Sequence, residues 1–146
     1  MDPIQAREFY LTAIPMAATL GLRFELLTHE KCVMTLPDQP EYRNHVGGPH
    51  AGAMFTLGES AAGALVVANL GEYLGELIPL AGTVTIKFLA VARGDVTACA
   101  KATLDVEAIR ARVAAGEKPA FEVPVELFVD GELTGELTVA WVVVPA

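Results

Sequence analysis

The segment from Asn44 to Gly63, NHVGGPHAGAMFTLGESAAG, holds most of the residues that could do chemistry. Its only residue charged at neutral pH is Glu59, which stands among small and apolar residues. An unpaired carboxylate in such surroundings is costly to bury, or its pKa rises until it is neutral. Glu59 can therefore act as a general base or a nucleophile in a partly dry site. Two structural explanations compete: Glu59 lies where the segment reaches the surface, or it pairs with a cation such as Lys87.

Residues from about His50 to Leu70 predict one long helix, which Gly71 ends. Its N-terminus presents unpaired N–H groups and a partial positive charge, which suit an anion or a developing oxyanion. The first turn offers the N–H groups of Ala51 and Gly52. His50 either caps this turn or donates to a ligand, and a satisfied structural histidine is the competing explanation.

Glu59 lies eight residues after Ala51, which is roughly 12 Å along a helix at 1.5 Å per residue. An oxyanion donor and a base that act on one carbonyl must both come within roughly 3 Å of the reacting atoms. One copy of the helix does not readily supply both groups. Two antiparallel copies in a twofold dimer do, so the spacing predicts a composite site at a dimer interface.

The remaining pattern predicts a single α+β domain over residues 1–146, with about six antiparallel strands wrapped around one central helix. The helix has apolar residues on all sides, so it should be buried all round. Three hairpins and two further helices account for the rest. The expected elements are a helix over 2–18 interrupted at Pro15, a hairpin over 22–36, a loop over 37–48, a second hairpin around Gly94-Asp95, a short helix over 105–116 and a third hairpin around Asp130-Gly131.

Composition excludes several classes of protein. The chain has 146 residues, 53% of them hydrophobic, so a disordered protein is not expected. Its net charge of −8 argues against nucleic acid as a partner. The apolar window over 51–70 is almost long enough to span a bilayer, but Glu59 and Asn69 inside it argue against a membrane protein. No His/Cys cluster predicts a metal, and Cys32 and Cys99 are expected as free thiols in a cytoplasmic protein without a signal peptide.

The segment resembles the hotdog-fold acyl-CoA thioesterases of the phenylacetate-pathway and 4-hydroxybenzoyl-CoA type. Their signature is an Asn, a Gly three residues on, then His-Gly-Gly and an acidic residue nine after the His. Asn44, Gly47, His50 and Glu59 stand at these intervals. KFLAVARGD is similar to the family's strand and turn after the central helix. The helix before FEVPVELFVDGE and the late strand with Trp141 resemble the DUF4442 or YiiD C-terminal-like subgroup.

The resemblance implies a role for each matching residue. Glu59 would be the base that activates water, or the nucleophile that forms a mixed anhydride. Asn44 would position the water or the partner subunit's carboxylate, and His50 would orient the turn or assist at the carbonyl. The backbone N–H of Ala51 would polarise the thioester carbonyl. The family implies a homodimer or a dimer of dimers, with no cofactor beyond the coenzyme A of the substrate.

Several positions depart from the family pattern. Ala51 replaces the first Gly of His-Gly-Gly but keeps its N–H. Some relatives carry a hydroxyl residue four after the acid, where this chain has Gly63, so Ser60 and Thr83 are candidate replacements. Three cations, Arg43, Lys87 and Arg93, are candidates for coenzyme A phosphate contacts, with a solvated surface as the alternative for each. An apolar cavity for a medium-chain or aryl group is expected from Met54, Phe55, Leu57 and Leu65.

Two other functions remain open on the same fold. A 3-hydroxyacyl thioester dehydratase would use a His and a Glu fourteen residues apart, and His45 and Glu59 have this spacing. A non-catalytic acyl-CoA-binding module is favoured by the departures at Ala51 and Gly63. Hydrolysis of an acyl-CoA that depends on Glu59 would exclude both.

Overall fold

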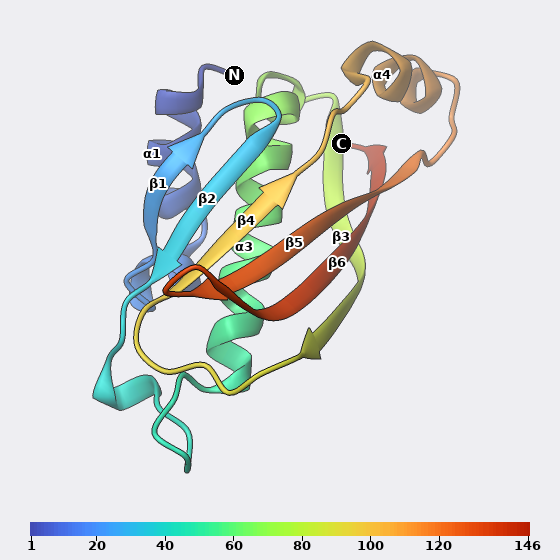
Figure 1. Cartoon of the computed structure of the whole chain (residues 1–146). Coiled ribbons are helices and arrows are strands. Elements are labelled where there is room, and N and C mark those ends of the chain that lie inside the picture. Colours follow the sequence, from blue (N-terminus) through green and yellow to red (C-terminus); the bar gives the residue numbers. More distant parts are fainter.

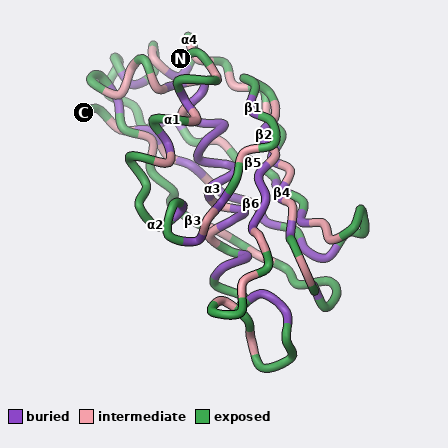
Figure 2. The backbone as a smooth tube through the Cα atoms, turned by 90° about the vertical axis from the view of Figure 1, so that its left-hand side faces the viewer, coloured by how far each residue is buried: buried purple, intermediate pink, exposed green.

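The long apolar segment forms helix α3, Ala51–Leu70, around which the rest of the chain is arranged (Figure 1). The computed structural model describes all residues, 1–146. Thirteen of the twenty α3 residues are buried, and the tube in Figure 2 shows the helix enclosed by other elements along much of its length. Burial all round was nevertheless wrong in part, because Gly52, Phe55, Thr56 and Glu59 form a stripe that stays exposed or half-exposed.

Six antiparallel strands form one sheet that curls around α3, in the order β1-β2-β4-β5-β6-β3 (Figure 1). This confirms the predicted α+β architecture. The face of the sheet toward α3 is lined by alternate apolar residues, such as Val96, Ala98 and Ala100 of the central strand β4, all at 0% exposure. The strands are β1 (Arg23–Leu27), β2 (Lys31–Leu36), β3 (Leu77–Phe88), β4 (Val96–Lys101), β5 (Ala120–Val129) and β6 (Glu132–Pro145).

The predicted hairpin around Gly94-Asp95 is wrong. β3 and β4 are not neighbours: β3 pairs with β6 at one edge, whereas β4 lies between β2 and β5. Residues 89–95 instead form a crossover beneath the first turn of α3 (Figure 1). Period-two alternation and a left-handed glycine, Gly94 at φ 86°, identify two strands and a turn but do not identify the partner of either strand.

The other predicted elements are confirmed. Helix α1 (Pro3–Ala13) starts at the Asp2 cap, and Pro15 begins the separate short helix α2 (Pro15–Thr19). Helix α4 (Val106–Ala114) buries Ile109 and Val113. Asp130 and Gly131 have φ of 49° and 82°, the left-handed pair that a two-residue hairpin turn requires between β5 and β6. Short 3-10 turns complete the chain at Pro40–Tyr42 (η1) and Gly71–Tyr73 (η2).

The structure shows where the apolar span and the two cysteines of the sequence lie. The span Ala51–Tyr73 is long and apolar enough to cross a membrane, and 67% of its most apolar window is buried inside the domain. The two cysteines are unpaired, as predicted. Cys32 is fully buried, and this burial raises the pKa of its thiol to about 12.

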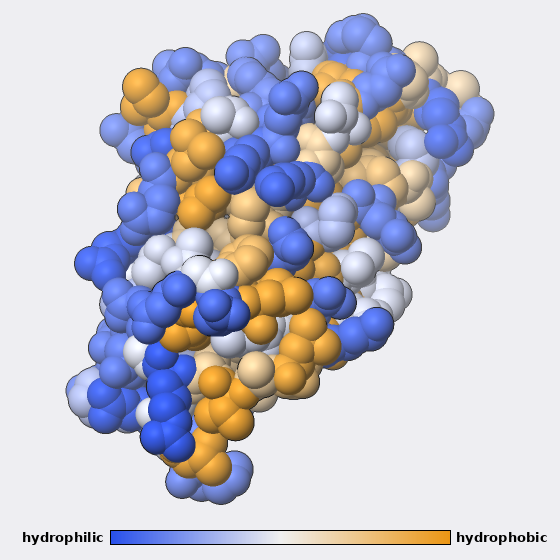
Figure 3. Space-filling view, in the orientation of Figure 1, coloured by the Kyte–Doolittle hydropathy of each residue, from blue (hydrophilic) through white to orange (hydrophobic).

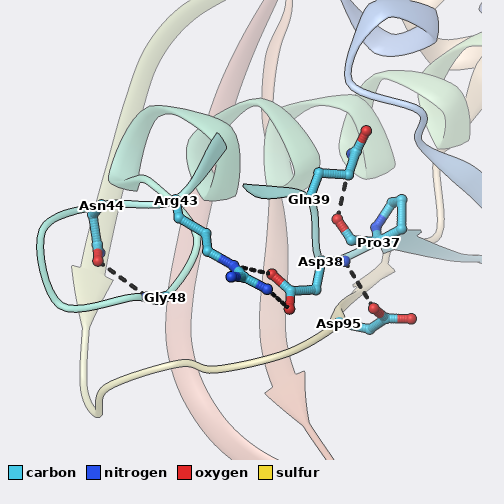
Figure 4. Close-up of polar contacts among 7 residues, drawn as sticks. All are labelled: Pro37, Asp38, Gln39, Arg43, Asn44, Gly48 and Asp95. Atoms are coloured by element: carbon cyan, nitrogen blue, oxygen red, sulfur yellow. Dashed lines mark hydrogen bonds and ion pairs between the residues drawn. The ribbon is translucent and has the colours of Figure 1, made fainter. Parts of the chain in front are cut away.

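A tight loop over residues 44–49 leads into α3. Asn44 holds it together: its Oδ1 accepts from the N–H groups of Val46 (3.0 Å) and Gly48 (3.1 Å), and its Nδ2 donates to the Pro49 carbonyl (3.2 Å). Figure 4 shows Asn44 bridging to Gly48 across the loop. Gly48 packs directly on the crossover, where a Cβ would lie 2.1 Å from the Ala92 carbonyl oxygen. Only glycine fits at position 48 without moving one of the two backbones.

We predict that Gly48→Ala lowers the free energy of unfolding by about 1–3 kcal/mol, the usual effect of overpacking. The Ala92 carbonyl belongs to the backbone, so the clash is not relieved by a rotamer change. Urea unfolding followed by circular dichroism measures this loss. Gly75→Ala is the matched control, because a Cβ there meets nothing within 4 Å, and it should stay within about 0.5 kcal/mol of wild type. Equal stabilities of the two variants would contradict the close contact.

Candidate active site

Glu59 lies in the middle of α3, on the stripe that the sheet leaves uncovered. Its carboxylate is half-buried and takes part in no hydrogen bond or ion pair within the chain. Lys87, the cation considered as a partner, is exposed on β3 and does not pair with it. Burial without compensation raises the pKa of Glu59 above its usual 4.5. Such a carboxyl is poised to exchange a proton closer to neutral pH.

Glu59 opens into a cavity of about 360 Å³, here called the carboxylate pocket. The pocket lies between α1, α3 and β3, and its walls are largely apolar. Glu59 is its only charged residue, and Tyr10 contributes a hydroxyl beside it. The lining comprises Phe9, Tyr10, Ala13, Ile14, Glu59, Gly63, Val66, Val67, Leu74, Ile78, Pro79, Leu80, Ala81 and Trp141.

The start of α3 opens into a second cavity of about 410 Å³, here called the helix-start pocket. It is lined by residues of the loop, of the first turn of α3, of the end of β3 and of the crossover: Asn44, Val46, Pro49, Ala51, Met54, Phe88, Leu89, Ala90, Val91 and Ala92. The N–H of Ala51 donates to no group of the chain. This free donor at a helix N-terminus is available to a ligand carbonyl.

His50 caps α3, as one of the two sequence interpretations expected. Its Nδ1 accepts a hydrogen bond from the Gly52 N–H at 2.8 Å, which places the proton of the neutral ring on Nε2. The Gly52 N–H is therefore occupied, and the prediction of two free N–H groups in the first turn is wrong. Of these two residues, only Ala51 has an N–H group that is free to donate to a ligand. His50, Gly52 and Phe55 line a third cavity of about 500 Å³ that also includes Arg43.

The structure changes the prediction for Asn44. Both its side-chain oxygen and its amide nitrogen are engaged in the loop, so within its own chain it positions the turn that presents Ala51. Arg43 is likewise engaged: its guanidinium donates to both carboxylate oxygens of Asp38, at 3.0 and 2.7 Å (Figure 4). Because its guanidinium is already paired with Asp38, Arg43 is a weaker candidate for a contact with a coenzyme A phosphate.

Other predicted residues lie outside these cavities. The exposed residues His45, Gly47, Thr83, Lys87 and Arg93 line none of the three pockets, although Arg93 directly follows the crossover residues of the helix-start pocket.

The residues expected to line an acyl cavity have different positions in the structure. Leu57 and Leu65 are at 0% exposure in the core and line none of the three pockets, whereas Met54 lines the helix-start pocket and Phe55 lines the third cavity. Residues of a helix that is apolar all round do not reveal which side faces a cavity, because every side carries the same kind of residue.

Tyr10 is the site residue that sequence reasoning missed. It lies on α1 and is 3% exposed, with its ring edge-on to Phe24 at 6.3 Å. Burial raises its pKa far above the usual 10, and the neighbouring charge of Glu59 raises it further. The signal in the sequence was Gly63, because a glycine inside a buried helix indicates a close neighbour, but nothing local identified that neighbour as Tyr10.

Solved structures share this architecture over nearly the whole chain. A protein of Pseudomonas aeruginosa described as "Probable Thioesterase" is 26% identical, with a TM-score of 0.83 and coverage of 100% of this chain and 97% of its own. A second P. aeruginosa protein, a thioesterase solved as a mutant, is 20% identical, with a TM-score of 0.79 and coverage of 100% and 96%. The PaaI protein of the Escherichia coli phenylacetic acid degradation operon is 16% identical, with a TM-score of 0.76 and coverage of 96% and 91%.

These similarities establish the hotdog fold, in which a curled antiparallel sheet wraps one long helix. A search of curated proteins found no match to the sequence. Residues 5–143 match the family described as "Domain of unknown function (DUF4442)". Since this match spans nearly the entire chain, the protein belongs to the DUF4442 family.

Proposed function

We propose that the protein is a thioesterase that hydrolyses an acyl-CoA with a medium-chain or aryl acyl group. The observation that carries this proposal is Glu59, a half-buried carboxyl without a partner, which faces an apolar cavity. The fold is shared with proteins described as thioesterases, which supports the same reaction class. Coenzyme A enters only as part of the substrate, and no other cofactor takes part.

In the proposed reaction Glu59 accepts a proton from a water molecule whose oxygen attacks the thioester carbon. The carbonyl oxygen becomes an oxyanion, which the N–H of Ala51 stabilises at the start of the helix. Collapse of the intermediate breaks the C–S bond. The thiolate of coenzyme A then takes the proton from Glu59, so one thioester and one water give one acid and one thiol.

The two groups come from different subunits in this proposal. Ala51 and Glu59 line separate pockets of one chain, and eight residues of helix hold them roughly 12 Å apart. The uncovered stripe of α3 is flanked by exposed apolar residues of α1 and of the edge strand β3, including Phe9, Ile78 and Leu80. A second copy on this face would bury them and would bring each Glu59 toward the partner's helix start.

The outer face of the sheet is mixed in polarity. Figure 3 shows hydrophilic residues interspersed with apolar patches on the side of the molecule that Figure 1 presents. Several apolar side chains near the crossover, Phe88, Leu89 and Val91, are at least half-exposed. These residues line the helix-start pocket, and we assign them to contacts with the pantetheine arm or with the second subunit.

We predict that Glu59→Gln lowers kcat for acyl-CoA hydrolysis on the order of 10²–10⁴-fold, the usual contribution of a general base. Thiol release measured with a colorimetric reagent over a panel of acyl-CoA substrates tests this. The amide keeps the size of the side chain, so acyl-CoA binding measured by calorimetry should persist. Binding without turnover in either protein would establish an acyl-binding module instead. An enoyl product without thiol release would establish a dehydratase.

The raised pKa of Glu59 sets two pH effects of known sign. Activity needs the ionised base, so kcat/KM should fall as pH drops through a pKa above 4.5. The folded state holds the proton more tightly than the unfolded state, so ionisation of Glu59 reduces stability as pH rises. Glu59→Gln should therefore unfold at a higher temperature than wild type at pH 7 and at a similar temperature at pH 4. An equal difference at both values would contradict the burial effect.

A mixed dimer tests whether the site is shared. Glu59→Gln and Asn44→Ala should each be nearly inactive, because each lacks one half of every site. When the two variants are unfolded and refolded together, half of the dimers are mixed, and each mixed dimer has one intact site. We expect recovery of about a quarter of wild-type activity. If each chain carried a complete site, the mixture would be no more active than the average of the two variants.

A further inference from the structure

Gly63 and Glu59 lie one helical turn apart, on the same side of α3. A Cβ at position 63 would lie 2.8 Å from the Tyr10 hydroxyl oxygen, and 3.2 and 3.4 Å from the ring atoms Cε2 and Cζ. The phenol of α1 thus occupies the space that a side chain of residue 63 would take. The glycine makes this approach possible and places the hydroxyl beside the carboxylate.

Tyr10 is 3% exposed, and its hydroxyl interacts with the side chain of Ser60, which lowers the Tyr10 pKa against the effect of burial. Ser60, which follows Glu59, is at 0% exposure, and its hydroxyl has no hydrogen-bond partner of ordinary geometry. Glu59 itself has none. Polar groups buried without partners are unfavourable, and in folded proteins they are usually satisfied by water or a ligand. Tyr10 and Glu59 line the same pocket, so one water between them would satisfy both.

We infer that the Tyr10 hydroxyl holds the attacking water against Glu59, which makes Tyr10 a catalytic residue supplied by α1. This inference rests on the proposed thioesterase function. One O–H of the water donates to the Glu59 carboxylate and the other donates to the Tyr10 oxygen. The water's lone pair is then directed to the thioester carbon.

Tyr10 transfers no proton in this step. The proton moves from the water to Glu59 and then to the leaving thiolate, as in the proposed reaction. Burial suits Tyr10 to this role, because it keeps the phenol neutral and the ring fixed against Phe24. A fixed acceptor lowers the entropic cost of orienting the water.

Tyr10→Phe tests the inference, because it removes the hydroxyl and keeps the ring. We expect kcat to fall about 10–100-fold, as the loss of a hydrogen bond to a reacting group predicts, while KM stays within about twofold of wild type. The melting temperature should hardly change. Tyr73→Phe is the matched control, since Tyr73 packs under Arg110 beyond the far end of α3, and its kcat should equal that of wild type.

A second variant removes the hydroxyl of Tyr10 on α1 and introduces one at position 63 of α3. In Tyr10→Phe/Gly63→Ser, loss of the phenol oxygen removes the closest contact, 2.8 Å, that a Cβ at position 63 would make. The remaining contacts are with the ring, which has to shift by only a few tenths of an ångström. The serine hydroxyl, one turn from Glu59, should restore kcat several-fold over Tyr10→Phe. A role of Tyr10 in packing alone would not be restored by this second change.

The outcomes separate the inference from the proposed function. Wild-type turnover that Glu59→Gln abolishes and Tyr10→Phe leaves unchanged would overturn the inference alone. It would also be overturned if Tyr10→Phe raised only KM, or if the folded double variant were no more active than the single variant. No thiol release by the wild type from any acyl-CoA would overturn both.

Discussion

A helix with apolar residues on every side has to be covered on almost every side, and this requirement organises the whole domain. Helix α3 buries residues such as Leu57, Ala61 and Leu65 completely, and six strands curl around it to do so. The burial of apolar surface is the main favourable contribution to folding. A single sheet of six strands does not close around a helix, so one stripe remains uncovered. Glu59 lies on that stripe, where a carboxyl is tolerated and a ligand can reach it.

The small residues of α3 and of the loop before it determine how close each neighbour comes. Gly48 accepts the backbone of the crossover, Gly58 accepts the Leu137 side chain of β6, and Gly63 accepts the Tyr10 phenol. Glycine is less favourable than alanine within a helix. Each of these glycines nevertheless allows a different element to contact the helix or the loop before it. The positions of the candidate catalytic groups therefore follow from where side chains are missing as much as from where they are present.

Much of the fold could be predicted because its signals are local. The bounds of α3, the break at Pro15 and the turn at Asp130-Gly131 all depend on neighbouring residues, and all were confirmed. The pairing of β3 could not be predicted in this way, because its alternation fits any strand edge of suitable length. Nor could the lining of the carboxylate pocket, where Tyr10 and Trp141 meet α3 from distant parts of the chain. The sequence allowed two interpretations of His50, as a helix cap or as a donor to a ligand. The orientation of its side chain decides between them, and this orientation is not predictable from the sequence.

The pairing of β3 also affects the order in which the domain can be assembled. β6 is last in chain order, yet it is an inner strand, and its partners run from Leu77↔Pro145 to Phe88↔Gly135. β3 ends at Phe88 and β6 begins at Glu132, so β3 leaves the ribosome well before its partner strand. Until then one flank of the apolar helix has no cover. Contacts between residues so far apart in sequence slow folding, and meanwhile they leave exposed apolar surface that is prone to aggregation. We therefore expect that synthesis of this protein depends on chaperones more than its modest size suggests.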